Sequence, residues 1–164
     1  KGSEGNARRG PSLSHRIDWV FRHSGLPLRV VAEFGQWRRV EDQDGAGGWV
    51  HYALLSGVRT ALVQKDMLEL LAKPDARASV VARAEAGAIV RLHECTKDWC
   101  RVSGGGEKGW VPKTTIWGVD PDEILAGLPA DSPGGRPHLA RALMRAGWNS
   151  VPASSTGAAR AARR

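Results

Sequence analysis

Short apolar runs separated by turn-forming residues recur along the chain up to about residue 118. Each half of this region carries three runs that are rich in β-branched residues or alternate between apolar and polar positions, and such runs predict β-strands. They cover Leu28 to Phe34, Trp37 to Glu41 and Gly48 to His51, then Ala88 to Cys95, Trp99 to Ser103 and Gly109 to Val111. The turns Asp42 to Gly47 and Gly104 to Lys108 supply residues that adopt positive φ, so we expect antiparallel hairpins.

The chain contains the same series of residues twice. Gly25, Trp37 and Trp49 reappear as Gly87, Trp99 and Trp110, at offsets of 62, 62 and 61 residues. A repeated unit with about five short strands in ~50 residues predicts a small, partly open β-barrel rather than a sheet layered with helices. We therefore expect an all-β protein with two small barrels in tandem, formed by residues 4–58 and 62–118.

The ends of the two units are less regular than their centres. Ala61 to Val63 looks like a strand that finishes the first barrel or starts the second. In the tail, residues 119–164, Pro121 to Leu128 and His138 to Ala146 are candidate short helices, because proline suits a first helical turn and the later segment has apolar residues at helical spacing. Beyond Trp148 the chain consists largely of Ser, Ala, Gly and Arg, so we expect disorder there.

The composition is that of an ordinary globular protein. Of the 164 residues, 41% are hydrophobic and 25% are charged, which argues against full disorder. No apolar run approaches the ~20 residues that a membrane-spanning helix needs. The net charge of +7 is spread without any block of five like charges, which is typical of a solvated surface and only weakly suggests an anionic partner.

Enzyme signatures are absent from the sequence. It has no Gly-x-Ser-x-Gly elbow, His-Glu-x-x-His motif, phosphate loop or dinucleotide fingerprint. Ser14, His15 and Asp18 are residue types of a hydrolytic triad, yet adjacent residues on a strand point to opposite faces, so Ser14 and His15 would not converge. We expect neither an enzyme nor a cofactor.

The opening stretch Asn6-Ala7-Arg8-Arg9-Gly10-Pro11-Ser12 resembles the Asn-x-Arg-x-Gly-Pro-Ser signature of bacterial SH3-like (SH3b) domains, and the Trp-x-x-Val and Gly-Trp-Val series resembles the rest of it. The likeness covers roughly Glu4 to Gly118. The two-repeat arrangement resembles tandem SH3b proteins of Gram-negative bacteria that carry an export signal. It implies two SH3-like barrels, a binding role and a periplasmic or secreted location. The chain departs from the signature at Ala7, where a larger aliphatic residue is usual, and the second copy opens with Leu71 to Asp75, which lacks the Asn and the Gly-Pro-Ser.

Cys95 and Cys100 bracket a turn between two predicted strands, so their side chains could face each other at disulfide distance. The alternative is two reduced, half-buried thiols in a cytosolic protein, and the resemblance to exported proteins favours the disulfide. Closing so short a loop would contribute only ~2 kcal/mol. His93 beside Cys95 hints at zinc, but a closed zinc site needs four ligands and no second pair lies nearby in sequence, so we expect no metal.

Seven of the ten aromatic residues are tryptophans, which suit both a small core and a ligand groove. Trp49 and Trp110 lie between Gly and Val in the closing strands, and we expect them to be buried against the barrel. Trp37 and Trp99 begin a strand directly after a turn. The resemblance implies that an aromatic residue at this place lies at the mouth of the ligand groove.

A peptide bound by the first copy would use Trp37 as a flat apolar platform. Arg8, Arg9 or Arg38 would then pair with a carboxylate, such as those on cell-wall stem peptides, although a solvated surface is the alternative for each arginine. The candidate ligand-binding residues are Arg8, Trp37, Arg38, His51, Tyr52 and Trp99.

Three hypotheses of function follow. The first is a non-catalytic binding module of the bacterial cell envelope that recognises cell-wall peptide, such as that of peptidoglycan, or an envelope protein. The second is a basic small barrel that binds nucleic acid, for which Trp37-Arg38-Arg39 is the main sequence feature. The third is structural: the second copy, with its degraded opening signature, has lost its groove and serves to present the first copy or to dimerise.

Overall fold

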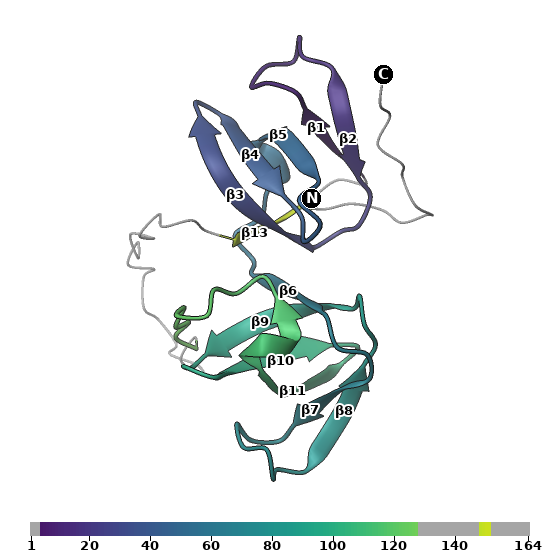
Figure 1. Cartoon of the computed structure of the whole chain (residues 1–164), viewed down its shortest axis with the longest axis vertical. Helices are drawn as coiled ribbons and strands as arrows, with labels where there is room; N and C mark the ends of the chain where they lie inside the picture. Colours follow the sequence, from purple (N-terminus) through teal and green to yellow (C-terminus); the bar gives the residue numbers. More distant parts are fainter. Residues whose placement is uncertain (1–3, 128–147, 152–164) are drawn as a thin grey trace, which may run out of the picture.

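The computed structural model describes residues 4–127 and 148–151. These residues form two antiparallel β-barrels that follow one another along the long axis of the molecule (Figure 1). The described helical structure consists of two three-residue 3-10 turns, η1 (Tyr52–Leu54) and η2 (Lys113–Thr115). The all-β, two-barrel architecture expected from the repeat is confirmed.

The first barrel is a curved sheet with the strand order β13-β3-β4-β5-β1-β2. Its strands are β1 (Gly5–Arg8), β2 (Ile17–Phe21), β3 (Leu26–Phe34), β4 (Trp37–Glu41), β5 (Gly47–His51) and the short β13 (Trp148–Val151). Strand β13 pairs antiparallel with the beginning of β3. The core is small and consists of Ala7, Phe21, Leu28, Val40 and Val50, all buried.

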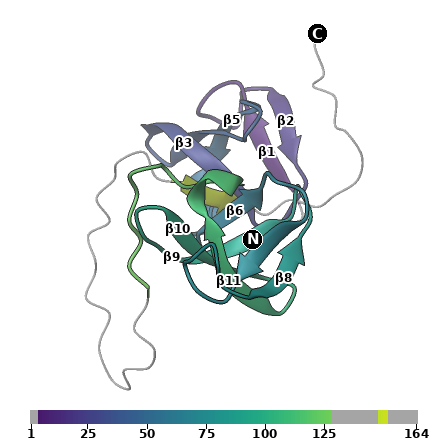
Figure 2. The same cartoon turned by 60° about the horizontal axis from the view of Figure 1, so that its bottom comes forward.

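The second barrel has the strand order β12-β6-β9-β10-β11-β7-β8. Its strands are β6 (Thr60–Val63), β7 (Leu68–Leu71), β8 (Val80–Ala84), β9 (Ile89–Cys95), β10 (Trp99–Gly104), β11 (Glu107–Pro112) and β12 (Ile116–Trp117). Figure 2 shows strands β8 to β11 around this barrel. It has its own core, separate from the first, that includes Leu70, Val90, Val102, Val111 and Ile116.

The two sheets repeat one topology. The order β3-β4-β5-β1-β2 in the first barrel corresponds to β9-β10-β11-β7-β8 in the second. The six strands predicted from the sequence are found, and each of the two predicted turns connects an antiparallel hairpin, β4–β5 and β10–β11. The predicted strand Ala61 to Val63 lies within β6, which pairs with β9 and β12 and therefore belongs to the second barrel.

Two sequence-based expectations about the core and the tail are wrong. Trp49 and Trp110 are only half-buried, because side chains alternate along a strand and the neighbouring Val50 and Val111 take the inward positions. The helix expected from Pro121 to Leu128 does not form over its described residues, which make a turn followed by a bridge between Leu125 and Cys95. The second expected helix, His138 to Ala146, lies outside the described residues.

The part of the chain expected to be disordered is described only in part. Beyond Trp148, the residues 149–151 belong to strand β13, and the residues that follow lie outside the described part.

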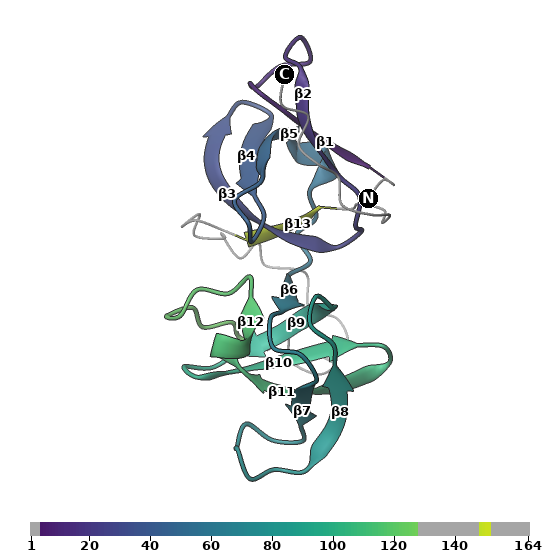
Figure 3. The same ribbon diagram turned by 45° about the vertical axis from the view of Figure 1, so that its right-hand side comes forward.

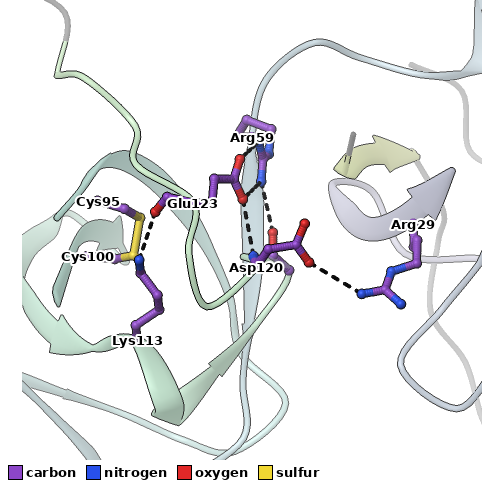
Figure 4. Close-up of polar contacts among 8 residues, drawn as sticks. Arg29, Arg59, Cys95, Cys100, Lys113, Asp120 and Glu123 are labelled. Carbon is purple, nitrogen blue, oxygen red and sulfur yellow. Dashed lines mark hydrogen bonds and ion pairs between the residues drawn. A yellow bond between two sulfur atoms is a disulfide. The ribbon is translucent and has the colours of Figure 1, made fainter. Parts of the chain in front are cut away.

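The two barrels contact each other at the start of β3 and β6 (Figure 3). The Thr60 hydroxyl donates a 2.7 Å hydrogen bond to the carbonyl oxygen of Gly25. Arg29 on β3 forms a 3.4 Å ion pair with Asp120, which follows the second barrel (Figure 4). These contacts form a short polar junction between the two barrels.

Candidate functional site

Four side chains form an aromatic cluster on the first barrel: Phe34, Trp37, His51 and Tyr52. Phe34 and Trp37 flank the β3–β4 turn and pair across it, and Trp37 in turn pairs with His51 at the end of β5. The Trp37 and His51 rings meet edge to face at 5.6 Å, and the His51 and Tyr52 rings lie 4.9 Å apart. Phe34 and Tyr52 are 65% and 51% exposed, so the cluster presents apolar ring surface to solvent.

His51 is held in one orientation at the centre of this cluster. Its Nδ1 accepts a hydrogen bond from the backbone N–H of Ala53, so the proton of the neutral ring lies on Nε2, which donates to Gln36 Oε1 at 3.1 Å. The Gln36 carbonyl also accepts from the backbone N–H of Tyr52. The β3–β4 turn thus fixes both the imidazole and the start of η1.

Of the arginines proposed to pair with a ligand carboxylate, Arg38 follows Trp37 directly in β4, but side chains alternate along a strand, so it lies on the opposite face of the sheet from the rings, with its register partner Glu33. Its Nη1 donates to the carbonyl oxygens of Gly35 and Trp37 at 2.8 and 2.9 Å, and its Nε lies 3.2 Å from a Glu33 carboxylate oxygen. Since Glu33 is half exposed, a ligand carboxylate could compete for this guanidinium.

Arg8 and Arg9 are engaged elsewhere. Arg8 donates to the carbonyl oxygens of Leu13 and His15 at 3.1 and 2.8 Å, and Arg9 pairs with Asp18 at 3.1 Å. Both arginines therefore brace the loop between β1 and β2 rather than join the aromatic cluster.

The opening signature has a structural role in that loop. The imidazole of His15 lies against the backbone of Gly10, where a Cβ atom would come within 2.5 Å of its Nε2, so a side chain at this position would displace the exposed imidazole. Ser12 Oγ lies 2.8 Å from His15 Nδ1. The Asp18 carboxylate faces Arg9 and Arg16 rather than the imidazole, and so Ser14, His15 and Asp18 form no catalytic triad.

In the second barrel, Trp99 occupies the place of Trp37, and its register partner is Pro112 where the first copy has His51. Lys113 then corresponds to Tyr52, but it is only 6% exposed. Its Nζ donates to the carbonyl oxygens of Pro121 and Glu123 at 3.2 and 2.7 Å (Figure 4). We call the stretch from Val119 to Gly127 the cover segment, because it lies over this lysine.

The cover segment is held at several points. The Arg59 guanidinium donates to both carboxylate oxygens of Glu123 at 2.6 and 3.1 Å (Figure 4), and Leu125 exchanges two backbone hydrogen bonds with Cys95. Burial acts to raise the pKa of Glu123, but the hydrogen bonds and positive charge of Arg59 outweigh it, so the pKa lies below its ordinary value of 4.5.

A pocket remains beside Trp99. It has a volume of about 470 Å³, and the cover segment forms part of its wall through Val119 and Pro121. The first copy presents an open aromatic surface at this place, whereas the second presents a walled pocket. The surfaces beside Trp37 and Trp99 therefore differ. This difference fits the expectation that the second groove is altered, and loss of binding there stays a prediction.

Cys95 and Cys100 form a disulfide between β9 and β10, with an S–S distance of 2.06 Å, as predicted. Both residues are buried in the core of the second barrel. His93 is hydrogen-bonded to Ser103 at 2.7 Å, and burial together with nearby cations lowers its pKa. Within the described residues, no group of three or more His, Cys, Asp or Glu is arranged to hold a metal ion.

Two curved sheets with one repeated strand order, with a tryptophan at the start of the equivalent strands β4 and β10, define a tandem small-barrel protein. Residues 1–57 and again 64–118 match the family model of the bacterial SH3 domain, so the chain belongs to this family and carries two copies of the domain. No curated protein matches the chain. In the described part of the chain, no helix is long and apolar enough to cross a membrane.

Sequence analysis missed Phe34 as a member of the aromatic cluster and Gln36 as the residue that holds the imidazole of His51. Phe34 is the last residue of β3, and Gln36 follows Gly35 in the β3–β4 turn. A usable signal was present: aromatic residues that flank a two-residue hairpin turn pair across it. The cover segment had no such signal, because its contacts join residues distant in sequence.

Proposed function

We propose that the chain is a non-catalytic binding module of the bacterial cell envelope and that the first barrel binds peptide on its aromatic cluster. The observation that carries the proposal is the exposed set of rings in which Trp37, His51 and Tyr52 contact one another and Phe34 is the register partner of Trp37 across the turn. Rings with few rotatable bonds present apolar area at a low cost in conformational entropy, as in the anchor residues of many interfaces.

The polar groups around the cluster suit a peptide ligand. The Tyr52 hydroxyl and the Gln36 amide can exchange hydrogen bonds with a peptide backbone. Arg38 follows Trp37 in β4 and pairs with Glu33 on the opposite face of the sheet, from which it can transfer to a ligand carboxylate such as those of cell-wall stem peptides. An extended peptide would lay apolar side chains on the rings, and its carboxylate would reach Arg38 by passing around the end of the β3–β4 hairpin.

The location in the envelope is supported by the disulfide. Disulfides persist in oxidising compartments such as the periplasm and are rare in the cytosol. The Cys95–Cys100 bond and the bacterial SH3 domains fit an extracytoplasmic location.

The test is retention on purified peptidoglycan. The unaltered chain is expected to be retained, and Trp37→Ala is expected to lose most of that retention, because the central platform of the cluster is removed. The matched control is Trp110→Ala, a half-buried tryptophan on the outer face of the second barrel, with thermal melting used to confirm that both variants fold.

Parallel titrations with RNA and DNA at two salt concentrations address the nucleic-acid hypothesis. Retention on peptidoglycan that is equal for Trp37→Ala and the unaltered chain would contradict the proposal. So would nucleic-acid affinity that falls steeply with salt in the absence of any peptidoglycan retention, since that dependence marks phosphate contacts.

A further inference from the structure

A cleft with a volume of about 400 Å³ lies between the two barrels, away from the aromatic cluster. This volume falls within the ~300–1,000 Å³ typical of ligand sites. The first barrel contributes the end of β2, the start of β3 and the β4–β5 turn, and the second contributes residues from β6, the β8–β9 turn, β9 and β12. The apolar lining is Trp19, Val20, Phe21, Leu26, Pro27, Leu62, Ile89 and Trp117.

The walls of the cleft are held in place by the junction between the barrels. The Thr60 hydroxyl bonds to the Gly25 carbonyl, one residue before Leu26 of the lining. Gly118, directly after Trp117, lies so close to the first barrel that a Cβ there would stand 3.4 Å from Pro27 Cβ. Trp19 and Trp117 therefore line one cleft whose two walls are in direct contact.

The ionisable side chains that line the cleft are those of Asp42, Asp44, Arg22 and His23. Asp42 and Asp44 both line the cleft, and neither takes part in any of the ion pairs found among the described residues. One Asp42 oxygen accepts the backbone N–H groups of Asp44 and Ala46, and burial raises the pKa of this carboxyl. Arg22 also lines the cleft, but its charge faces Glu4 at 3.9 Å.

We propose that this cleft binds a short peptide segment in which a lysine or arginine side chain is flanked by apolar residues. The cationic group would lie over an indole face, Trp19 or Trp117, and pair with the carboxylates of Asp42 and Asp44. The flanking apolar side chains would cover Leu26 and Ile89, one from each barrel. In a chain with a net charge of +7, two carboxylates without a cationic partner at an aromatic cleft give the charge complementarity that selects a basic ligand.

This site is independent of the proposed function of the aromatic cluster. It uses different residues and depends on both barrels, whereas the cluster lies on the first barrel alone. A bound segment would contact both domains at once, so its affinity would depend on the junction.

The test uses the full chain and a defined probe, the peptide acetyl-Leu-Lys-Leu-Lys-Leu-amide, with a second peptide in which both lysines are replaced by glutamates. Binding is followed by NMR through the indole N–H signals. We expect the lysine peptide to shift the signals of Trp19 and Trp117, and the glutamate peptide to leave them unchanged.

The double variant Asp42→Asn and Asp44→Asn is expected to weaken binding of the lysine peptide roughly tenfold or more. Asparagine keeps the side-chain oxygen that accepts the turn hydrogen bonds, so the fold is preserved. The matched control is Asp75→Asn, which has the same turn role, accepting from the Arg77 backbone N–H, but lies outside the cleft. This control should bind as the unaltered chain does.

Several results would overturn the inference. They are equal affinity of the double variant and the unaltered chain, equal binding of the glutamate peptide, or loss of binding in Trp37→Ala, which would place the peptide on the aromatic cluster instead. Formation of a dimer that shifts the Trp19 and Trp117 signals without any peptide, seen by sedimentation, would identify a second copy as the occupant and would also overturn it.

Discussion

At the scale of single residues, the Gly-Trp-Val triplets show how the barrels are closed. Valine takes the inward position, tryptophan lies half-buried on the outer face, and glycine lets a neighbouring strand approach closely. At Gly109 an added Cβ would lie 2.8 Å from Leu70 Cβ and 3.0 Å from the Leu71 carbonyl oxygen. The triplet thus brings β11 against β7.

This geometry predicts that Gly109→Ala destabilises the second barrel by about 1–3 kcal/mol, because the contacts at Gly109 involve backbone and Cβ atoms that cannot turn away. Chemical denaturation measures the loss. Gly57→Ala is the control, since nothing lies within 4 Å of a Cβ there, and it should leave stability nearly unchanged. Equal stability of the two variants would show that β11 and β7 are not this close.

At this scale the sequence predicts the strands that carry the Gly-Trp-Val triplets, but the expectation that Trp49 and Trp110 are buried is wrong. The alternation of side chains along a strand assigns opposite faces to neighbours, yet it does not say which face is inward. A tryptophan between Gly and Val looks like core by hydrophobicity alone, whereas the barrel is too small to enclose a second row of large side chains beside Val50 and Val111.

At the scale of elements, strands and hairpins could be predicted, and the segments that only tertiary contacts define could not. Strands β3, β4 and β5 have strong alternation and glycine turns, but β2 has a single buried residue and β8 has none, so they carry little pattern. The cover segment depends on Arg59 and Lys113, whose partners are distant in sequence. No local pattern indicates such contacts.

The Glu123 carboxylate gives the cover segment a pH dependence. Its pKa in the folded chain lies below 4.5, so the contact with Arg59 stabilises the segment above that pH and is lost as the pH falls through the folded value. We expect the Leu125 and Cys95 amide signals in NMR spectra to change as the pH falls below 4.5, through the lowered pKa of Glu123. Glu123→Gln, which cannot ionise, should show the loosened state at neutral pH and lack this transition. A transition that persists in Glu123→Gln would assign it to another group.

The disulfide stabilises the hairpin on which the cover segment rests. Replacing both Cys95 and Cys100 by alanine should lower the free energy of unfolding by at least about 2 kcal/mol from loop entropy, with a further loss because both side chains are buried. Denaturation of the variant beside the oxidised chain measures this difference. An unchanged midpoint would mean that the crosslink constrains nothing in the unfolded chain.

At the scale of the whole molecule, the sequence repeat predicts two barrels but not how they are joined. The junction uses the Thr60 hydroxyl, the Gly25 carbonyl and the Arg29–Asp120 pair, and although Gly25 opens the repeated series, the repeat does not say that its carbonyl meets Thr60. The cleft between the barrels was likewise beyond sequence reasoning, because its walls come from both copies. A repeat describes each copy, while the surface between copies depends on their relative placement.

The junction predicts unequal effects of two substitutions. Thr60→Val should weaken the coupling between barrels by roughly 1–2 kcal/mol, because it leaves the Gly25 carbonyl without its short hydrogen bond in a buried setting. Arg29→Gln should cost less than about 0.5 kcal/mol, since that ion pair is more than 40% exposed on both sides. Calorimetry would show two separated unfolding transitions in Thr60→Val. A larger effect of Arg29→Gln would reverse this ranking.

The different surfaces beside Trp37 and Trp99 have a consequence for avidity. Two equivalent modules on one chain would bind a repetitive polymer at adjacent points. The second binding event would be intramolecular and strengthened by a high effective concentration. Here the cover segment removes that equivalence, so a ligand of the aromatic cluster should saturate at one molecule per chain. Duplication in this protein has therefore produced two unlike surfaces rather than two equivalent ones.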